Sequence, residues 1–458
     1  MAVEPQRGRA VGSRFLAALA YGDFQTLWTA NFFAGAAAWA LIVARGWIVY
    51  EFSDSSLWVG VVTFAAMAPR VVVSPFTGYL SDRFDRRTVL RAMFALNALH
   101  NLVLGWLMLS GSAEIWHIVV LSFVNGSARA AQMPAGQALI PNLVPRELLL
   151  NAIALNQATM HGSRLLGPLA IIPLLATTGT TGAIFLCAGF YLISLVQTMR
   201  LRTASTGRID QRQSFIRNFS EGAVYVYKTP ILFSIVVMAI FHCGLVMSFE
   251  SMLPVLSTKL LESGGGGTFF VGLTALLNES GAGFSVLMMA VGAGALTSAI
   301  ILAGIKSDLT KGRLFFIFGV FSGLSSFALG LSPNLATALP SAIIMGVSTA
   351  AFMTLTHTMI QTIVPDGVRG RVGAIYSVHI GGMMASMNAL NAWLSDILVG
   401  VPVLMNMFGG ALSSYLGAPL VLIVTGLAFA IIVQLSSLFI TMRTIYGGGV
   451  ARLAQSPA

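Results

Sequence analysis

Charge is scarce in this chain of 458 residues, because Lys, Arg, Asp and Glu together make up only 9% of it. A soluble globular protein carries about 25% charged residues. Acidic residues are the scarcest, with 16 Asp and Glu against 26 Lys and Arg. The hydrophobic fraction is 56%, and a bilayer can accommodate that much apolar surface whereas a soluble core cannot. The composition therefore indicates a membrane protein.

Residues for several kinds of chemistry are also missing. The two cysteines, Cys187 and Cys243, both lie in apolar runs, so no disulfide framework or thiolate metal site is indicated. The six histidines include no pair spaced three or four residues apart, as a helical metal site would need. Glycine runs lack the Gly-Lys-Ser/Thr ending of a phosphate-binding loop. We therefore expect no metal, no cofactor and no enzymatic activity.

Twelve apolar runs, each long enough to cross a bilayer, follow one another along the chain. A membrane-crossing helix needs about 20 mostly apolar residues, and hydrocarbon admits only helices or closed barrels because every backbone polar group needs an internal partner. These runs are too long for barrel strands. The sequence predicts an all-α membrane protein with twelve transmembrane helices near residues 26–49, 58–79, 88–109, 115–138, 151–175, 183–202, 231–253, 283–305, 314–331, 338–360, 373–398 and 419–441.

The positions of Lys and Arg predict the orientation of these spans. Cytoplasmic loops of membrane proteins carry an excess of basic residues. With both termini placed inside, only Lys259 among the basic residues outside the spans falls on the outer side. We therefore expect a multi-pass protein of the cell membrane with both termini in the cytoplasm. The same asymmetry accounts for the net charge of +10 without a nucleic-acid partner. The basic N-terminus is followed by no signal-peptide pattern, so none is expected.

A long polar segment divides the chain into two halves of six spans. The predicted units are residues 1–202, a cytoplasmic linker at 203–229, and residues 230–458. Part of the linker, 215–227, mixes aromatic and polar residues, which fits a helix lying on the inner membrane surface. An ordinary solvated linker remains the alternative. The segments 254–282 and 395–418 have no assigned place in this layout.

Two short motifs recur at the same place in each half. GYLSDRFDRR at 78–87 aligns with GIKSDLTKGR at 304–313, and IPNLVPREL at 140–148 aligns with IQTIVPDGV at 360–368. One pair follows the second span of its half, and the other follows the fourth. Repeats related by an axis along the membrane normal are one plan of secondary transporters.

These residues resemble a known family. GYLSDRFDRRTVL resembles the loop signature between spans 2 and 3 of the major facilitator superfamily, with Asp85 where the family often has glycine. IPNLVPRELLLNAIALN, GSRLLGPL, FSEGAVYVYKTPIL and VPDGVRGRVGAIYS resemble the branch of enterobactin-exporter-like and macrolide-efflux-like carriers. The resemblance extends from about residue 24 to 441. It implies a proton-driven exporter that works by alternating access.

The resemblance also implies site residues. The loop would act as a conformational latch through Gly78, Asp82, Arg83, Arg86 and Arg87. Its arginines alone would be explained as topology signals, but Asp82 would not, since acidic residues contribute little to orientation. An Asp can also bind the positive N-terminal end of a neighbouring helix.

Arginines within the apolar runs are the next candidates. A charge inside the membrane is costly and normally faces a cavity or a partner. Arg45 and Arg129 are candidates for a cavity. For Arg70 and Arg129 the alternative is snorkelling or a structural ion pair. Arg164 is a third candidate, or it braces the helix kink expected at Gly167 and Pro168. The fifth-span antiporter motif of the family ends in a form like G-P-x-x-G-G, and Gly167 and Pro168 match its Gly-Pro, whereas the later glycines are absent here.

Glu250 is the best acidic candidate within a span. It lies 19 residues past Ile231, where span 7 begins, and Arg45 lies 19 residues past Thr26, where span 1 begins. Spans 1 and 7 are equivalent in the repeat, so we expect the two side chains at similar depth, paired across an outer gate. Protonation of Glu250 would then open the gate. Alternatively, Glu250 reaches the outer water.

Two histidines are candidates for proton transfer. His161 and His242 lie deep in predicted spans, where a neutral histidine can also serve as a simple hydrogen-bonding group.

The pattern as a whole favours a secondary active transporter that exports a small amphiphilic molecule, drug-like or siderophore-like, in exchange for protons. The alternatives are a transport-inactive receptor or scaffold on the same fold, and an importer. The expected partners are a small-molecule substrate, protons and the lipid bilayer, and a monomer is expected.

Overall fold

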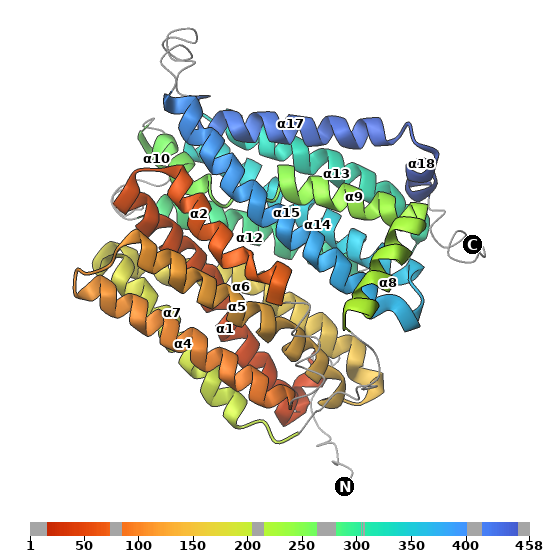
Figure 1. Ribbon diagram of the computed structural model, residues 1–458, viewed down its shortest axis with the longest axis horizontal. Helices are drawn as coiled ribbons and strands as arrows, with labels where there is room; N and C mark the ends of the chain where they lie inside the picture. Colours follow the sequence, from red (N-terminus) through yellow and green to blue (C-terminus); the bar gives the residue numbers. More distant parts are fainter. Residues whose placement is uncertain are drawn as a thin grey trace.

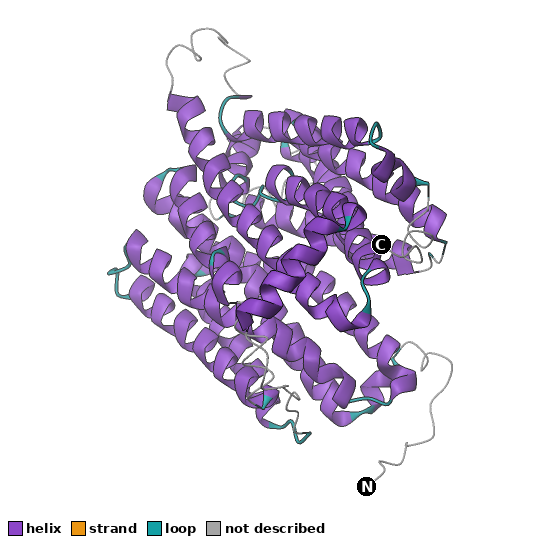
Figure 2. Ribbon diagram, turned by 45° about the vertical axis from the view of Figure 1, so that its right-hand side comes forward, coloured by secondary structure: helices purple, strands orange, loops and turns teal. Residues whose placement is uncertain are grey.

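The computed structural model describes residues 16–73, 85–203, 215–262, 281–303, 305, 307–400 and 415–447. Within these ranges every regular element is a helix, as Figures 1 and 2 show. The predicted all-α membrane fold is therefore confirmed.

The helices follow the predicted spans closely. In the first half they are α1 (Gly22–Ser53), α2 (Ser56–Met67), α4 (Arg86–Leu109), α5 (Ile115–Leu139), α6 (Leu149–Thr177) and α7 (Gly179–Met199). In the second half they are α9 (Pro230–Leu245), α10 (Leu253–Glu262), α12 (Ala282–Ala303), α13 (Asp308–Leu331), α14 (Leu335–Ile363), α15 (Asp366–Gly400), α17 (Ala418–Ser436) and α18 (Ile440–Tyr446).

By length and apolar composition, eight helices among the described residues qualify to cross a membrane. The count rises to nine if the residues of α8 (Phe215–Lys228) and α9, bent by 101°, are taken as one broken span. The other predicted spans, at α5, α6 and α15, are also helical, but they contain more polar residues, such as Arg129, Arg164 and Asn388. The full count of twelve spans stays a prediction.

The helices form two bundles that lie side by side in Figure 1. In one, α1 packs on α6 and α7, and α4 packs on α5 and α7. In the other, α14 packs on α12 and α13, and α13 packs on α17. The bundles meet mainly along α2 with α15 and along α6 with α12. Each of these contacts joins the second span of one half to the fifth span of the other, so the interface has the symmetry of the sequence repeat.

The two ends of the bundles differ in charge. At the end where α1 begins and α17 finishes, helix termini carry Arg86, Arg87, Lys228, Arg313 and Arg371. We call this end the basic face. The end where α1 finishes, and where α2 and α12 begin, is called the opposite face.

One span departs from the prediction. The run 231–253 was expected to be a single helix, but α9 ends at Leu245 and α10 begins only at Leu253. Non-helical backbone at membrane depth is tolerated where protein groups satisfy it. The intervening residues Val246–Met252 are buried except for a half-buried Met247, and they carry Glu250.

Candidate functional site

Side chains of α15 support the break between α9 and α10. The amide oxygen of Asn388 accepts a 3.2 Å hydrogen bond from the Ser251 N–H, and the Ser251 hydroxyl donates to the Asn388 carbonyl at 2.9 Å. Asn391 donates to the Ser248 hydroxyl at 2.8 Å. These bonds replace helical ones, so the chain can turn here at little cost. The turn buries Phe249 and Glu250, which are 1% and 5% exposed.

Four arginines of the first half lie near enough to Glu250 to act on its charge. They are Arg164 of α6, Arg70, Arg129 and Arg45. Arg45 and Arg164 are only 5% and 8% exposed, while Arg70 and Arg129 are half-buried. We call these five residues the arginine cluster. Its formal charge is three positive units when every member is ionised, and it draws on α1, the span Ser56–Val73, α5, α6 and the α9–α10 break.

Aromatic rings hold Arg164 in place. Its guanidinium carbon lies 4.6 Å from the centre of the Trp39 ring and 6.0 Å from that of Phe249. Such stacking is favourable because the ring face is negative. Gly167 lets α6 approach α1 closely enough for this contact, since a Cβ there would stand 2.4 Å from the Ala36 carbonyl oxygen. The structure therefore gives Gly167 a packing role beside Arg164.

Several polar atoms of the cluster are unpaired. Within the described residues, Arg45 Nη1, Arg164 Nε and Glu250 Oε2 are buried without a hydrogen-bond partner. Arg45 and Glu250 interact electrostatically, but among the described contacts no ion pair joins them. Direct pairing of the two across a gate stays a prediction. Unpaired buried charges are costly, so such atoms mark a site that a further group can complete.

Buried amides extend the polar region through the first half. Asn125 of α5 donates to Asn97 of α4 at 2.7 Å, and Asn97 lies 3.4 Å from Gln132. The sequence analysis did not single out these residues, because uncharged amides do not interrupt an apolar run. Asn125 precedes Arg129 by one helical turn, so this network lies beside the cluster.

A second charged contact joins the halves at the opposite face. The Asp396 carboxylate of α15 accepts hydrogen bonds from the Ser55 hydroxyl at 2.5 Å and from the Ser56 and Leu57 N–H groups at 3.0 Å. Asp396 therefore caps α2, whose first N–H groups have no partner in their own helix. The sequence analysis missed it, because an acid near the end of a span is usually solvated.

Only part of the predicted latch can be located. Gly78, Asp82 and Arg83 lie outside the described residues. Arg86 donates to the Ala138 carbonyl at 2.7 Å, and Arg87 donates to Asp85 at 2.6 Å and to the Arg202 carbonyl at 2.7 Å. These contacts lie within the first half, where they tie the start of α4 to the ends of α5 and α7.

The two histidine candidates lie in different surroundings. His161 is half-buried on α6, one turn before Arg164, and interacts with its charge. His242 of α9 is fully buried, with its ring 4.4 Å from that of Phe352 and 5.1 Å from that of Phe429. Neither ring nitrogen of His242 has a hydrogen-bond partner among the described residues. The structure thus places His161 near the arginine cluster and His242 in an aromatic cluster of the second half.

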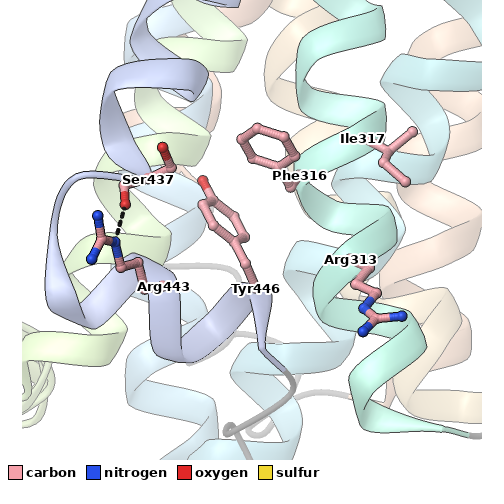
Figure 3. A pocket seen from close by; sticks show the side chains of 6 residues that line it. All are labelled: Arg313, Phe316, Ile317, Ser437, Arg443 and Tyr446. Carbon is pink, nitrogen blue, oxygen red and sulfur yellow. Dashed lines mark hydrogen bonds between the residues drawn. The ribbon is translucent and has the colours of Figure 1, made fainter.

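A pocket of about 440 Å³ lies at the basic face between α13 and the α17–α18 segment (Figure 3). Arg443 of α18 donates to the Ser437 carbonyl at 2.7 Å. The arginine cluster contributes no residue to this pocket, which is lined by Arg313, Phe316, Ile317, Ser437, Arg443 and Tyr446.

Two helical bundles joined along equivalent helix pairs are one plan found among secondary transporters. The sequence matches the profile of the transmembrane secretion effector family over residues 13–420. The chain belongs to this family of the major facilitator superfamily, and the predicted superfamily is thereby confirmed.

Several characterised relatives are efflux proteins. The chain is 24% identical to the multidrug efflux pump Tap of Mycolicibacterium fortuitum, over 74% of this chain and 81% of the relative. It is 21% identical to macrolide efflux protein A of Streptococcus pyogenes, over 78% and 90% of the two chains. The staphyloferrin A transporter of Staphylococcus aureus shares 24% identity over 28% of this chain and 33% of its own length.

Solved transporters share the fold. A mutant of the nucleoside transporter NupG superposes with a TM-score of 0.66 at 12% identity, covering 90% of this chain and 99% of its own. A bacterial homologue of the human lysosomal transporter Spinster, in an inward-facing and occupied conformation, superposes with a TM-score of 0.64 at 14% identity, covering 98% and 100%. The family match and the curated relatives confirm the prediction that the chain is a transporter and not an enzyme.

Proposed function

We propose that this transporter exports a small amphiphilic molecule from the cell by alternating access, coupled to the proton gradient. The observation that carries the proposal is the arginine cluster, which lies at the contact between the two halves and contains one buried carboxylate. A carboxylate is a group that can take up and release a proton within the cycle. The efflux function of the relatives Tap and macrolide efflux protein A supports the outward direction.

The test is flux in liposomes that contain the purified protein. An imposed pH gradient is expected to drive an amphiphilic fluorescent dye across the membrane against the direction of proton flow. Empty liposomes and liposomes treated with a protonophore serve as controls. Movement of dye together with protons would indicate an importer. If no dye in a set of anionic, neutral and cationic amphiphiles moves, the alternative of a transport-inactive receptor is favoured.

The proposal includes an orientation in which the basic face lies in the cytoplasm. Single cysteines at two exposed serines test it, Ser112 after α4 and Ser220 on α8. In a background without the buried Cys187 and Cys243, a membrane-impermeant thiol reagent applied to intact cells is expected to label position 112 and not 220. Position 220 should react once the cells are permeabilised. Labelling of 220 in intact cells would overturn the orientation and the place of the linker.

The latch belongs to the same proposal. In the proposed cycle, the loop containing Gly78, Asp82 and Arg83 closes the cytoplasmic side when the carrier faces outward. Arg86 and Arg87, which follow this loop in sequence, hold the start of α4 to the ends of α5 and α7.

A further inference from the structure

We infer that the substrate is an organic anion, with a carboxylate, sulfonate or phosphate group on an apolar body, and that Arg45 and Arg164 bind this group. The inference rests on the proposed transport function, and it names the chemical class of the substrate. It does not depend on the direction of transport.

The first evidence for an anionic substrate is the excess positive charge of the arginine cluster. Four guanidinium groups act on the charge of a single carboxylate, Glu250. Within the membrane an uncompensated charge is costly and normally lines the path of a substrate or ion. Two of the arginines, Arg45 and Arg164, are more than nine-tenths buried, so bulk water cannot solvate them fully. An anion would lower the energy of this cluster, whereas a cation would be repelled by it.

The second evidence for an anionic substrate is a set of buried hydrogen-bond donors without acceptors. Among the described residues, Arg45 Nη1 and Arg164 Nε are buried and have no hydrogen-bond acceptor. A guanidinium presents N–H groups in a planar fork that fits the paired oxygens of a carboxylate, sulfonate or phosphate. The two arginines come from α1 and α6, which pack together. An oxyanion beside either guanidinium would satisfy a donor that the protein itself leaves unpaired.

The neighbouring side chains indicate the rest of the ligand. Trp39 and Phe249 lie on Arg164, and Phe249 comes from the second half, directly before Glu250. A ligand held by Arg164 would therefore contact aromatic rings of both halves. Aromatic faces bind apolar or aromatic bodies well, which favours an amphiphilic anion over a small inorganic one.

The membrane potential is compatible with export of this class. The cell interior is negative, and a potential of this sign drives an anion outward. The energy from the potential adds to whatever the protons supply.

The test compares two dyes with the same ring system, anilinonaphthalene sulfonate and the uncharged phenylnaphthylamine. Full-length wild-type protein in phosphatidylcholine nanodiscs is expected to bind the sulfonate saturably and at least about tenfold more tightly. Arg164→Gln and Arg45→Gln should each weaken sulfonate binding about tenfold, as loss of a charge-assisted hydrogen bond implies, and leave the neutral dye unchanged. Lys228→Gln is the matched control, because it removes one exposed cation of the basic face.

Glu250→Gln separates electrostatics from damage to the fold. Loss of the carboxylate raises the charge of the cluster, so this variant should bind the sulfonate several-fold more tightly than the wild type. A misfolded protein would instead bind it more weakly. Equal affinity for both dyes, or an equal effect of the substitutions on both, would overturn the inference. Charge-dependent binding without any flux in liposomes would overturn the transport proposal and leave the ligand class intact.

Discussion

Glu250→Gln is expected to abolish transport driven by a pH gradient and also exchange of substrate between compartments at equal pH, because the variant stays in the protonated form, which changes conformation only when no anion is bound. Glu250 is the one acidic member of the arginine cluster and is 5% exposed. Its charge is influenced by Arg164 of α6, Arg70 of the span Ser56–Val73, Arg129 of α5 and Arg45 of α1. Glutamine has nearly the same shape and cannot release a proton. Dye flux into liposomes, with and without the gradient, measures both modes.

A control for this variant is available on α8. Glu221→Gln removes an exposed carboxylate that pairs with Arg371 at 2.5 Å, outside the cluster, and should leave both modes of transport intact. Glu250→Gln with normal flux and an unchanged pH dependence would show that Glu250 has no coupling role.

The sign of the electrostatics constrains the cycle. A protonated Glu250 leaves the cluster more positive, so proton binding and anion binding strengthen each other. Exchange of protons for substrate anions therefore requires a conformational rule. The protonated carrier can change conformation only after it has released the anion. We therefore expect proton coupling to arise at the conformational step and not through competition for the site.

Asp396→Asn is expected to open the opposite face of the carrier. The carboxylate bonds three groups at the start of α2 and lies near the positive end of that helix. Loss of its charge should remove about 1 to 2 kcal/mol of closure energy, which shifts the population of the open state by roughly tenfold. Spin labels at Ser112 in the first half and Ala336 in the second would report a longer distance. Transport would slow if closure became limiting.

Asp54→Asn is the matched control. Asp54 lies two residues before α2 on the same face, is exposed, and has a φ of 47°, which asparagine also accepts. Its substitution should leave the distance unchanged. If both variants change the distance equally, Asp396 does not hold the opposite face closed.

A second variant tests the same contact through packing alone. A Cβ on Gly60 of α2 would stand 2.4 Å from the Ala392 Cβ of α15. Gly60→Val should therefore separate these helices and lengthen the same distance.

The helical architecture was accessible from the sequence because it depends on local properties. Each span must bury about 20 apolar residues and satisfy its own backbone, and the predicted runs coincide with helices such as α4 and α5 to within a few residues. The repeat of short motifs likewise implied two equivalent halves. The candidates Arg45, Arg164 and Glu250 were found because charge in an apolar run is rare and costly.

Tertiary structure alone decided how these residues combine. The break at Val246–Met252 is held by Asn388 and Asn391, which lie well over a hundred residues further along the chain, so the local apolar pattern predicted a continuous helix. Glu250 experiences the charge of four arginines instead of one partner, and these come from α1, the span Ser56–Val73, α5 and α6. Asp396 caps α2 and joins the two halves because the first N–H groups of α2 have no hydrogen-bond partners within their own helix. Burial and hydrogen-bond complementarity between distant segments depend on the packing of the two bundles, and hydropathy along one segment does not encode that packing.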